Sequence, residues 1–194
     1  MHRFANPGRF LRLANRIQPW LKALTALGFL LGLYLALIGS PPDYQQGETV
    51  RIMYIHVPSA WMALLAYLIL GLASASALIW RHPLADIAAE AISPIGAAFT
   101  LLALITGSLW GKPMWGTYWV WDPRLTAQLV LLFLYLGYMA LRSGIDDLGR
   151  ADRASAVLAI IGVVNLPIIR YSVEWWNSIH QAPSVMKMER PSMP

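Results

Sequence analysis

The chain has 194 residues, of which 57% are hydrophobic and only 13% are charged. This composition is too apolar for a soluble domain of this length and indicates an integral membrane protein. The formal net charge of +5 comes with no basic tract interleaved with exposed aromatic residues, so nucleic acid is excluded as a partner. The absence of cysteine excludes disulfides and thiolate metal sites.

Five apolar runs are long enough to predict transmembrane helices, although the last two are close to the minimum of about 17 residues. The runs cover residues 21–39, 58–80, 87–109, 125–141 and 154–169. Pro94 and Pro167 lie inside or near the ends of runs and are expected to kink them. No repeat or second domain is visible. The sequence therefore predicts a single all-α polytopic membrane domain over residues 1–194.

The basic segment before the first run also fits a signal peptide. However, the apolar run from Ala23 to Ile38 is too long for a signal-peptide core, and no clear cleavage site precedes Pro41. We therefore interpret the apolar run as a first transmembrane helix with a cytoplasmic N-terminus.

Basic residues support this orientation, because five of them crowd the first helix, which usually dominates topology. The predicted cytoplasmic set is Arg3, Arg9, Arg12, Arg16, Lys22, Arg81, Arg142, Arg150 and Arg153. The predicted outer set is Arg51, Lys112, Arg124, Arg170, Lys187 and Arg190. Three segments then lie on the outer side, namely residues 40–57, residues 110–126 and the chain from Arg170 onward, with the C-terminus outside.

Residues 110–126, WGKPMWGTYWVWDPRLT, do not resemble an ordinary span. As a helix, the stretch would place Met114, Tyr118 and Trp121 on one face and Trp115 and Trp119 on another, with no polar side. One interpretation is an aromatic belt at the level of the lipid headgroups. The interleaved glycines, proline and charges favour the other interpretation, an outward-facing amphipathic surface against which a flat ligand lies.

Asp122 and Pro123 are favoured residues for the N-cap and the first position of the helix that follows. Arg124 then lies in the first helical turn, where it opposes the helix dipole. We expect Arg124 to face an anion.

The predicted topology divides the four histidines between the two sides. His2 and His82 are cytoplasmic, whereas His56 and His180 lie outside, on the side of residues 110–126. His56 is expected at the mouth of the second span. His180 follows YSVEWW, which as a helix would put Val173, Trp176 and His180 on one stripe along the membrane surface.

Each outer histidine is either a hydrogen-bonded bystander or a metal ligand. Two imidazoles from separate segments could bind heme iron from opposite faces. Zinc usually takes three or four protein ligands, and the outer side offers no cysteine and few carboxylates, so heme fits better. Indoles could stack on the ring, and its propionates could meet a cation. The candidate cations are Arg51, Lys112, Arg124 and Arg170.

The stretch WGTYWVWDPRLT at residues 115–126 resembles the signature of the WWD-domain heme-handling membrane proteins. Together with YQQGETVRIMYIHVPSAW and GVVNLPIIRYSVEWWNSIHQ, it resembles the cytochrome c maturation protein C family (CcmC, heme exporter protein C) over residues 43–181. The resemblance implies a non-covalent heme b with His56 and His180 as axial ligands. The residues expected to contact the heme ring or its propionates are Arg51, Trp110, Lys112, Trp115, Tyr118, Trp119, Trp121, Asp122, Arg124 and Trp176.

The resemblance also implies a place in the cell and a set of partners. Heme is held at the periplasmic face of the bacterial inner membrane and passed to the heme chaperone CcmE, in an ABC transporter complex with CcmA, CcmB and CcmD. The family usually has six spans, one more than predicted here. The implied role is heme transport and presentation, without catalytic residues of its own.

Three other functions were weighed. A cytochrome c synthase of the WWD group, a heme lyase, is expected to be longer, with further spans. A diheme electron-transfer subunit needs at least four intramembrane histidines, and the predicted spans contain none. A plain solute permease needs a polar path, for which the spans offer only Glu90, Thr100, Thr106, Gln128 and Asn165.

Overall fold

The computed structural model describes residues 6–180, and within that range every regular element is helical. Five stretches among the described residues are long and apolar enough to cross a membrane, and the fifth consists of two consecutive helices. This confirms the predicted all-α polytopic architecture. The elements are α1 (Pro7–Tyr34), the π-helix η1 (Leu35–Gly39), α2 (Val50–Trp80), α3 (Pro83–Trp115), α4 (Pro123–Gly144), α5 (Leu148–Gly162) and α6 (Asn165–Trp175).

The helices extend beyond the apolar runs that predicted them. α1 begins at Pro7, because the Asn6 side chain accepts the Arg9 N–H at 3.2 Å and proline suits the first helical position. α2 begins at Val50, so the outer loop predicted for residues 40–57 is shorter. α3 ends at Trp115, where Gly116 adopts a left-handed conformation (φ 79°) and its N–H bonds the Lys112 carbonyl.

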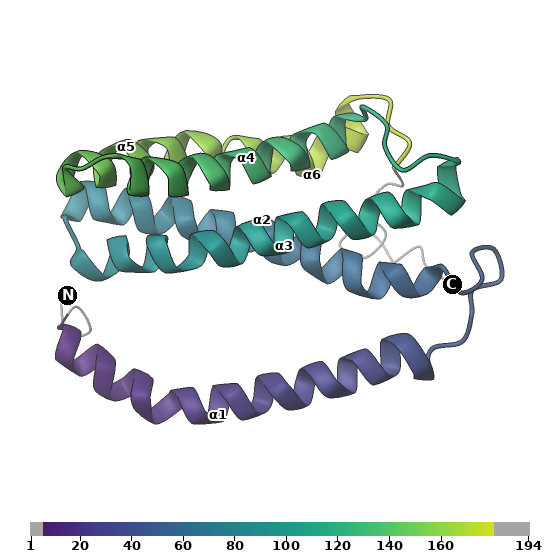
Figure 1. Ribbon diagram of the computed structural model, residues 1–194, viewed down its shortest axis with the longest axis horizontal. Coiled ribbons are helices and arrows are strands. Elements are labelled where there is room, and N and C mark those ends of the chain that lie inside the picture. The colour runs from purple at the N-terminus through teal and green to yellow at the C-terminus, as the bar shows by residue number, and fades with distance from the viewer. Residues whose placement is uncertain (1–5, 181–194) are drawn as a thin grey trace.

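The chain runs back and forth, so its connections gather at two ends of the bundle (Figure 1). One end carries residues 40–49, residues 116–122 and residues 176–180. We call it the histidine end, because it holds His56 and His180. The other end carries the α2–α3 and α4–α5 connections, and we call it the arginine end after Arg142. The described parts of the three segments predicted to share one side therefore do share one end of the molecule.

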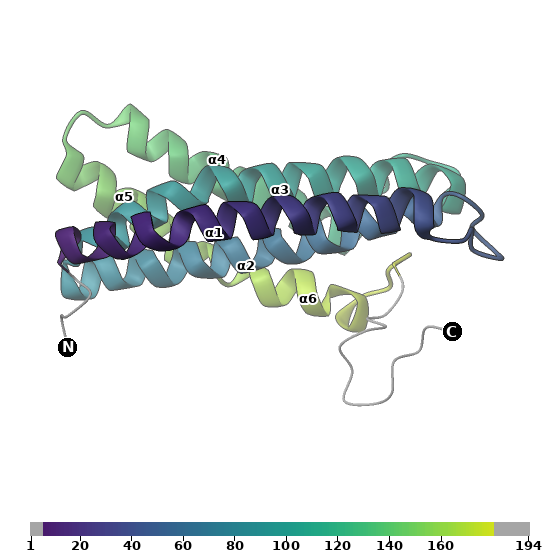
Figure 2. The same cartoon turned by 90° about the horizontal axis from the view of Figure 1, so that it is seen from below.

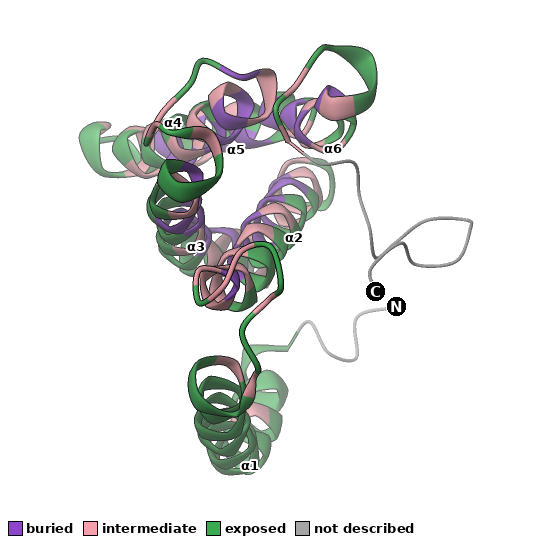
Figure 3. Cartoon of the chain, turned by 90° about the vertical axis from the view of Figure 1, so that its right-hand side faces the viewer, coloured by how far each residue is buried: buried purple, intermediate pink, exposed green. Residues whose placement is uncertain are grey.

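The core lies between α2, α3, α4 and α5. Tyr67 and Tyr135 are fully buried and meet edge to face at 4.9 Å, and the Tyr135 hydroxyl donates to the Ala63 carbonyl at 2.8 Å. Gly96 has no room for a side chain, because the Tyr135 ring lies directly against it. By contrast, α1 has no buried residue and stands apart from the bundle (Figure 3).

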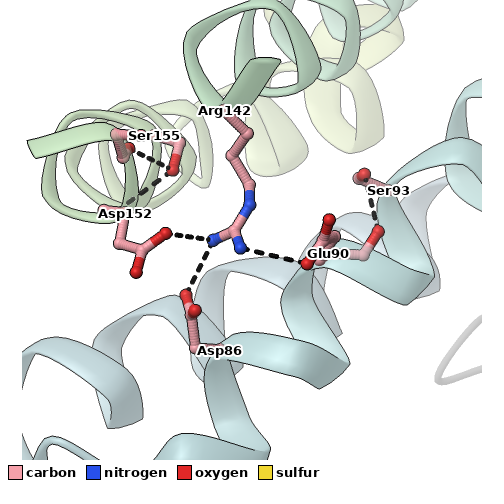
Figure 4. Close-up of polar contacts among 7 residues, drawn as sticks. Asp86, Glu90, Ser93, Arg142, Asp152 and Ser155 are labelled. Carbon is pink, nitrogen blue, oxygen red and sulfur yellow. Dashed lines mark hydrogen bonds and ion pairs between the residues drawn. The ribbon is translucent and has the colours of Figure 1, made fainter. Parts of the chain in front are cut away.

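Arg142 joins three helices at the arginine end. Its guanidinium contacts Asp86 at 2.9 Å and Glu90 at 3.0 Å, both on α3, and Asp152 on α5 at 2.8 Å (Figure 4). Only 15% of the Arg142 side chain is exposed. One planar donor group therefore braces α4 against its two neighbours.

The fifth span is broken between α5 and α6, at Val163 and Val164, and α6 continues toward the histidine end (Figure 2). The ring of Pro167 would clash with the Val163 carbonyl in an uninterrupted helix, which accounts for the break. Asn165 then ties the start of α6 to α4, since its side-chain amide donates to the Ala127 carbonyl at 2.9 Å. The kink predicted at Pro167 is thus a break one turn before it.

Candidate functional site

His56 lies in the second turn of α2, not just ahead of the helix as predicted. Its Nδ1 is 3.0 Å from the Ala103 carbonyl and 3.1 Å from the Thr106 hydroxyl oxygen, both on α3. A carbonyl only accepts hydrogen bonds, so Nδ1 carries a proton, and in the neutral ring Nε2 keeps its lone pair. The ring fits against α3 because position 107 is glycine. A Cβ there would lie 2.9 Å from the His56 Cε1.

His180 is held by Asp122, the N-cap residue of α4. The His180 Nδ1 lies 3.0 Å from the Asp122 Oδ1. Because an ionised carboxylate only accepts hydrogen bonds, the proton is again on Nδ1 and Nε2 again keeps its lone pair. Burial lowers the pKa of His180 to about 4 against the opposing pull of Asp122, so the ring is neutral at pH 7.

The Asp122 carboxylate is almost fully enclosed. Burial alone would raise its pKa, but hydrogen bonds from the Ser178 hydroxyl and the Arg124 N–H, the nearby His180 and the Ile179 N–H outweigh burial and lower the pKa. The contacts are 2.7 Å from the Ser178 Oγ, 2.9 Å from the Arg124 N and 3.0 Å from the Ile179 N. The predicted N-cap is confirmed, and the same side chain fastens residues 178–180 to α4.

Two indoles lie between the histidines. Ring centroids are 6.1 Å apart for His56 and Trp110, 6.4 Å for Trp110 and Trp115, and 4.9 Å for Trp115 and His180. We call these four residues the ring chain. The Trp110 indole N–H donates to the Gln46 side chain at 3.0 Å, and this bond attaches the loop before α2 to the ring chain. Two histidines separated by more than a hundred residues thus share one continuous aromatic cluster.

The other predicted aromatics also belong to the segments at the histidine end. Tyr118 is 56% exposed, Trp121 is 74% exposed and Trp176 is 51% exposed, whereas Trp119 is half-buried. Trp119 packs edge to face on Trp121 at 5.5 Å, and the Lys112 ammonium lies 5.3 Å from the Tyr118 ring centre. Neither of these contacts involves a residue of the ring chain.

The candidate cations occupy different positions. Arg51 bonds the Leu37 and Ser40 carbonyls at 2.7 Å and 3.2 Å and pairs with Glu48, so it fastens the end of η1 to α2. Arg124 is half-buried in the first turn of α4, near enough to Arg170 on α6 for the two charges to interact. Arg124 and Arg170 are therefore two candidate cations that lie near each other, an arrangement that favours an anion between them.

Two helical arrangements that the sequence allows at this end do not occur. Residues 116–122 are not helical, so Met114, Tyr118 and Trp121 do not share a helix face. α6 ends at Trp175, and residues 176–180 are not helical, so Val173, Trp176 and His180 form no stripe. The reason is tertiary, because Asp122 captures the main-chain N–H of Ile179 together with the side chains of Ser178 and His180. Residues 181–194, with Lys187 and Arg190, and residues 1–5, with His2, lie outside the described residues.

Several residues of the site were not predicted. Ala103, Thr106 and Gly107 shape the seat of His56, Ser178 shares Asp122 with His180, and Gln46 holds Trp110. Spacing does offer one clue: Ala103 and Gly107 are small residues one helical turn apart, a pattern that marks close approach between membrane helices.

His56 and His180 suit a metal that is already bound by other ligands, as in a macrocycle. Within residues 6–180, no group of three or more His, Cys, Asp or Glu side chains lies close enough to hold a bare metal ion. Two neutral imidazoles with available Nε2 atoms suit a metal macrocycle, whose iron needs only axial ligands.

Known proteins resemble this chain over most of its length. The sequence model of the heme exporter protein C family matches residues 1–194. Heme exporter protein C of Bradyrhizobium diazoefficiens is 58% identical over 184 residues, covering 95% of this chain and 70% of the relative. The Escherichia coli K12 protein of the same name is 48% identical over 187 residues, covering 96% and 76%. A cytochrome c biosynthesis ccmC-like mitochondrial protein of Marchantia polymorpha is 45% identical over 155 residues, covering 80% and 65%. The chain therefore belongs to the heme exporter protein C family, CcmC.

Proposed function

We propose that this protein holds heme b between His56 and His180 and presents it for cytochrome c maturation. Membership of the heme exporter protein C family supports a role in heme export and cytochrome c maturation. The observation that carries the proposal is the state of the two histidines. They come from α2 and from the segment after α6, lie at the same end, and both engage Nδ1 while keeping Nε2 available.

The chemistry of the surrounding residues fits heme. Hydrogen bonds at Nδ1 fix the tautomer and orientation of a metal-binding histidine and raise the basicity of Nε2. Trp110 and Trp115 offer aromatic faces for the porphyrin, and Arg124 offers a charge for a propionate. The bound group supplies iron as a Lewis acid for the two nitrogens, and the protein supplies ligands, stacking surface and charge.

The proposed orientation puts the histidine end in the periplasm and the N-terminus in the cytoplasm of a bacterial inner-membrane protein. The support is the excess of basic residues around α1 and at the arginine end. Exposed aromatic rings at the histidine end would then lie at the outer headgroup region, where Trp and Tyr are enriched.

We further propose that heme passes from this site to the chaperone CcmE, within a complex with CcmA, CcmB and CcmD. A presenting protein needs an accessible rim beside its ligands. Tyr118, Trp121 and Trp176 provide one next to the segment that carries His180.

The role needs no catalytic acid or base. The Asp122 carboxylate is committed to four donors, and its lowered pKa keeps it ionised, so it is a poor proton donor. Glu174 faces Arg170 at 4.0 Å, Glu48 pairs with Arg51 at 3.0 Å, and Asp43 accepts the N–H groups of Gln45 and Gln46. The acids at this end are assigned to structure rather than to chemistry.

The packing gives little support to a solute permease. Of the polar residues in the predicted spans, Thr100 and Thr106 bond carbonyls of their own helix, Asn165 bonds Ala127 and Glu90 pairs with Arg142. Only the Gln128 side-chain nitrogen is buried without a hydrogen-bond partner among these five residues. Hydrogen-bonding capacity used inside the bundle is not available to a permeating solute.

The test is heme binding by the detergent-purified protein. His56→Ala and His180→Ala, alone and together, should abolish the low-spin ferric absorption spectrum of the wild type. His82→Ala at the arginine end is the matched control and should leave the spectrum unchanged. A double variant that copurifies with undiminished low-spin heme would reject the ligand assignment.

A further inference from the structure

The two histidines are held in very different ways. His56 belongs to α2, and its Nδ1 partner is a main-chain carbonyl of α3. His180 lies in residues 176–180, which form no helix, and its Nδ1 partner is the side chain of Asp122. Moving His56 requires moving a transmembrane helix, whereas moving His180 requires only the loss of side-chain contacts.

Asp122 forms three hydrogen bonds with this segment. Its Oδ2 accepts from the Ser178 hydroxyl at 2.7 Å and the Ile179 N–H at 3.0 Å. Its Oδ1 accepts from the His180 Nδ1 at 3.0 Å and the Arg124 N–H at 2.9 Å. The side chain is 2% exposed. A single buried carboxylate therefore joins the start of α4 to three consecutive residues of the His180 segment.

We propose that Asp122 is the positioning residue for His180, and that His180 is consequently the ligand that detaches for heme transfer while His56 stays in place. This inference rests on the proposed heme-binding function. A hydrogen bond from Nδ1–H to a carboxylate orients the ring and makes Nε2 a stronger ligand for iron. The same contact therefore positions the ligand and controls its release.

A protein that transfers heme must be able to release it without unfolding. Cargo fixed by two transmembrane helices could leave only if the bundle deformed. With one ligand on a helix and one on a segment held by three hydrogen bonds to the Asp122 side chain, the segment can open without disturbing the core. Exposed Trp176 begins that segment and exposed Trp121 precedes Asp122, so opening occurs next to accessible surface.

The chain offers a matched pair of variants. Asp122→Ser keeps a good N-cap for α4 but is too short to hold His180, Ser178 and Ile179 together. Asp147→Ser makes the same change at the N-cap of α5, where Asp147 accepts the Arg150 N–H at 2.7 Å at the arginine end. Equal thermal unfolding of the two variants would show that Asp122→Ser folds.

We expect Asp122→Ser to bind heme roughly 10–100-fold more weakly, the usual cost of removing a residue that supports a metal ligand. Its ferric spectrum should change from six-coordinate low-spin to five-coordinate high-spin, and added imidazole should restore the low-spin form. Asp147→Ser should match the wild type. Because Asp122 acts through His180, Asp122→Ser should add nothing in a His180→Ala background but should weaken binding further in a His56→Ala background.

A second variant covers the case in which Asp122→Ser fails to fold. Asp122→Asn keeps the size and the N-cap but removes the charge, so the low-spin spectrum should persist with a raised heme midpoint potential relative to Asp147→Asn. Equal spectra and potentials in the Asp122 and Asp147 variants would overturn this inference alone. If the His56→Ala and His180→Ala variants had the same heme spectrum as the wild type, the proposed function would be overturned as well.

Discussion

Substitution of Gly107 by alanine tests whether the position of His56 matters for heme binding. The new methyl carbon would lie 2.9 Å from the His56 Cε1 and 3.4 Å from its Nδ1. Carbon atoms make favourable contact from about 3.5 Å, so the ring must retreat by roughly 0.6 Å or rotate. Either movement strains the 3.0 Å contact between Nδ1 and Ala103. Support of this kind is typically worth about 10–100-fold in metal affinity, which is the loss we expect.

The assay is heme titration of the purified protein, followed by absorption in the Soret region. Gly28→Ala on α1 is the control, because a Cβ there meets nothing within 4 Å. Both changes raise helix propensity by up to about 1 kcal/mol, so neither should unfold its helix. If Gly107→Ala bound heme as tightly as Gly28→Ala, the position of the His56 ring against α3 would not matter for heme binding, and the prediction would be refuted.

Three further changes test other contacts. Gly162→Ala brings a methyl group onto the Tyr67 hydroxyl and should destabilise the bundle by about 1–3 kcal/mol in thermal unfolding, with partial rescue by Tyr67→Phe; an unchanged melting temperature would contradict the packing. Arg142→Met leaves three carboxylates facing one another and should lower the free energy of unfolding by about 1–2 kcal/mol. This is less than the loss of a fully buried ion pair would cost, because the partners are partly exposed. The control Arg153→Met, on exposed surface, should change stability little. Gln46→Leu removes the acceptor of the Trp110 indole and should lower heme affinity, while Gln45→Leu, its exposed neighbour, should not; equal affinities would separate this loop from the site.

The features predicted correctly from sequence depend on local signals. Apolar runs identified all five spans, because a membrane helix must be apolar over its own length. The Asp122–Pro123 pair marked the start of α4, because an N-cap acts within a few residues. The sorting of segments between the two ends followed from counting spans.

The predictions that failed depend on distant contacts. Nothing in YSVEWWNSIH forbids a helix, yet α6 stops at Trp175 because Asp122, more than fifty residues earlier, captures Ser178, Ile179 and His180. Helix ends at Val50 and Trp115 were misjudged because helices continue past the apolar run into polar and aromatic sequence. The seat of His56 depends on α3 lying beside α2, which hydrophobic periodicity alone does not reveal.

Each end of the bundle is organised around one charged side chain, but the partners differ in a way that bears on function. Arg142 gathers carboxylates that all belong to helices, so the contact braces rigid elements. Asp122 gathers donors from a segment without regular structure, so the contact controls a part that can move alone. The two perturbations should therefore separate. Arg142→Met should lower thermal stability without altering heme coordination, and Asp122→Ser should alter heme coordination more than it alters stability. A similar loss of both properties in both variants would mean that the histidine end is as rigid as the rest of the bundle, and that heme could leave only by deforming the helices that hold it.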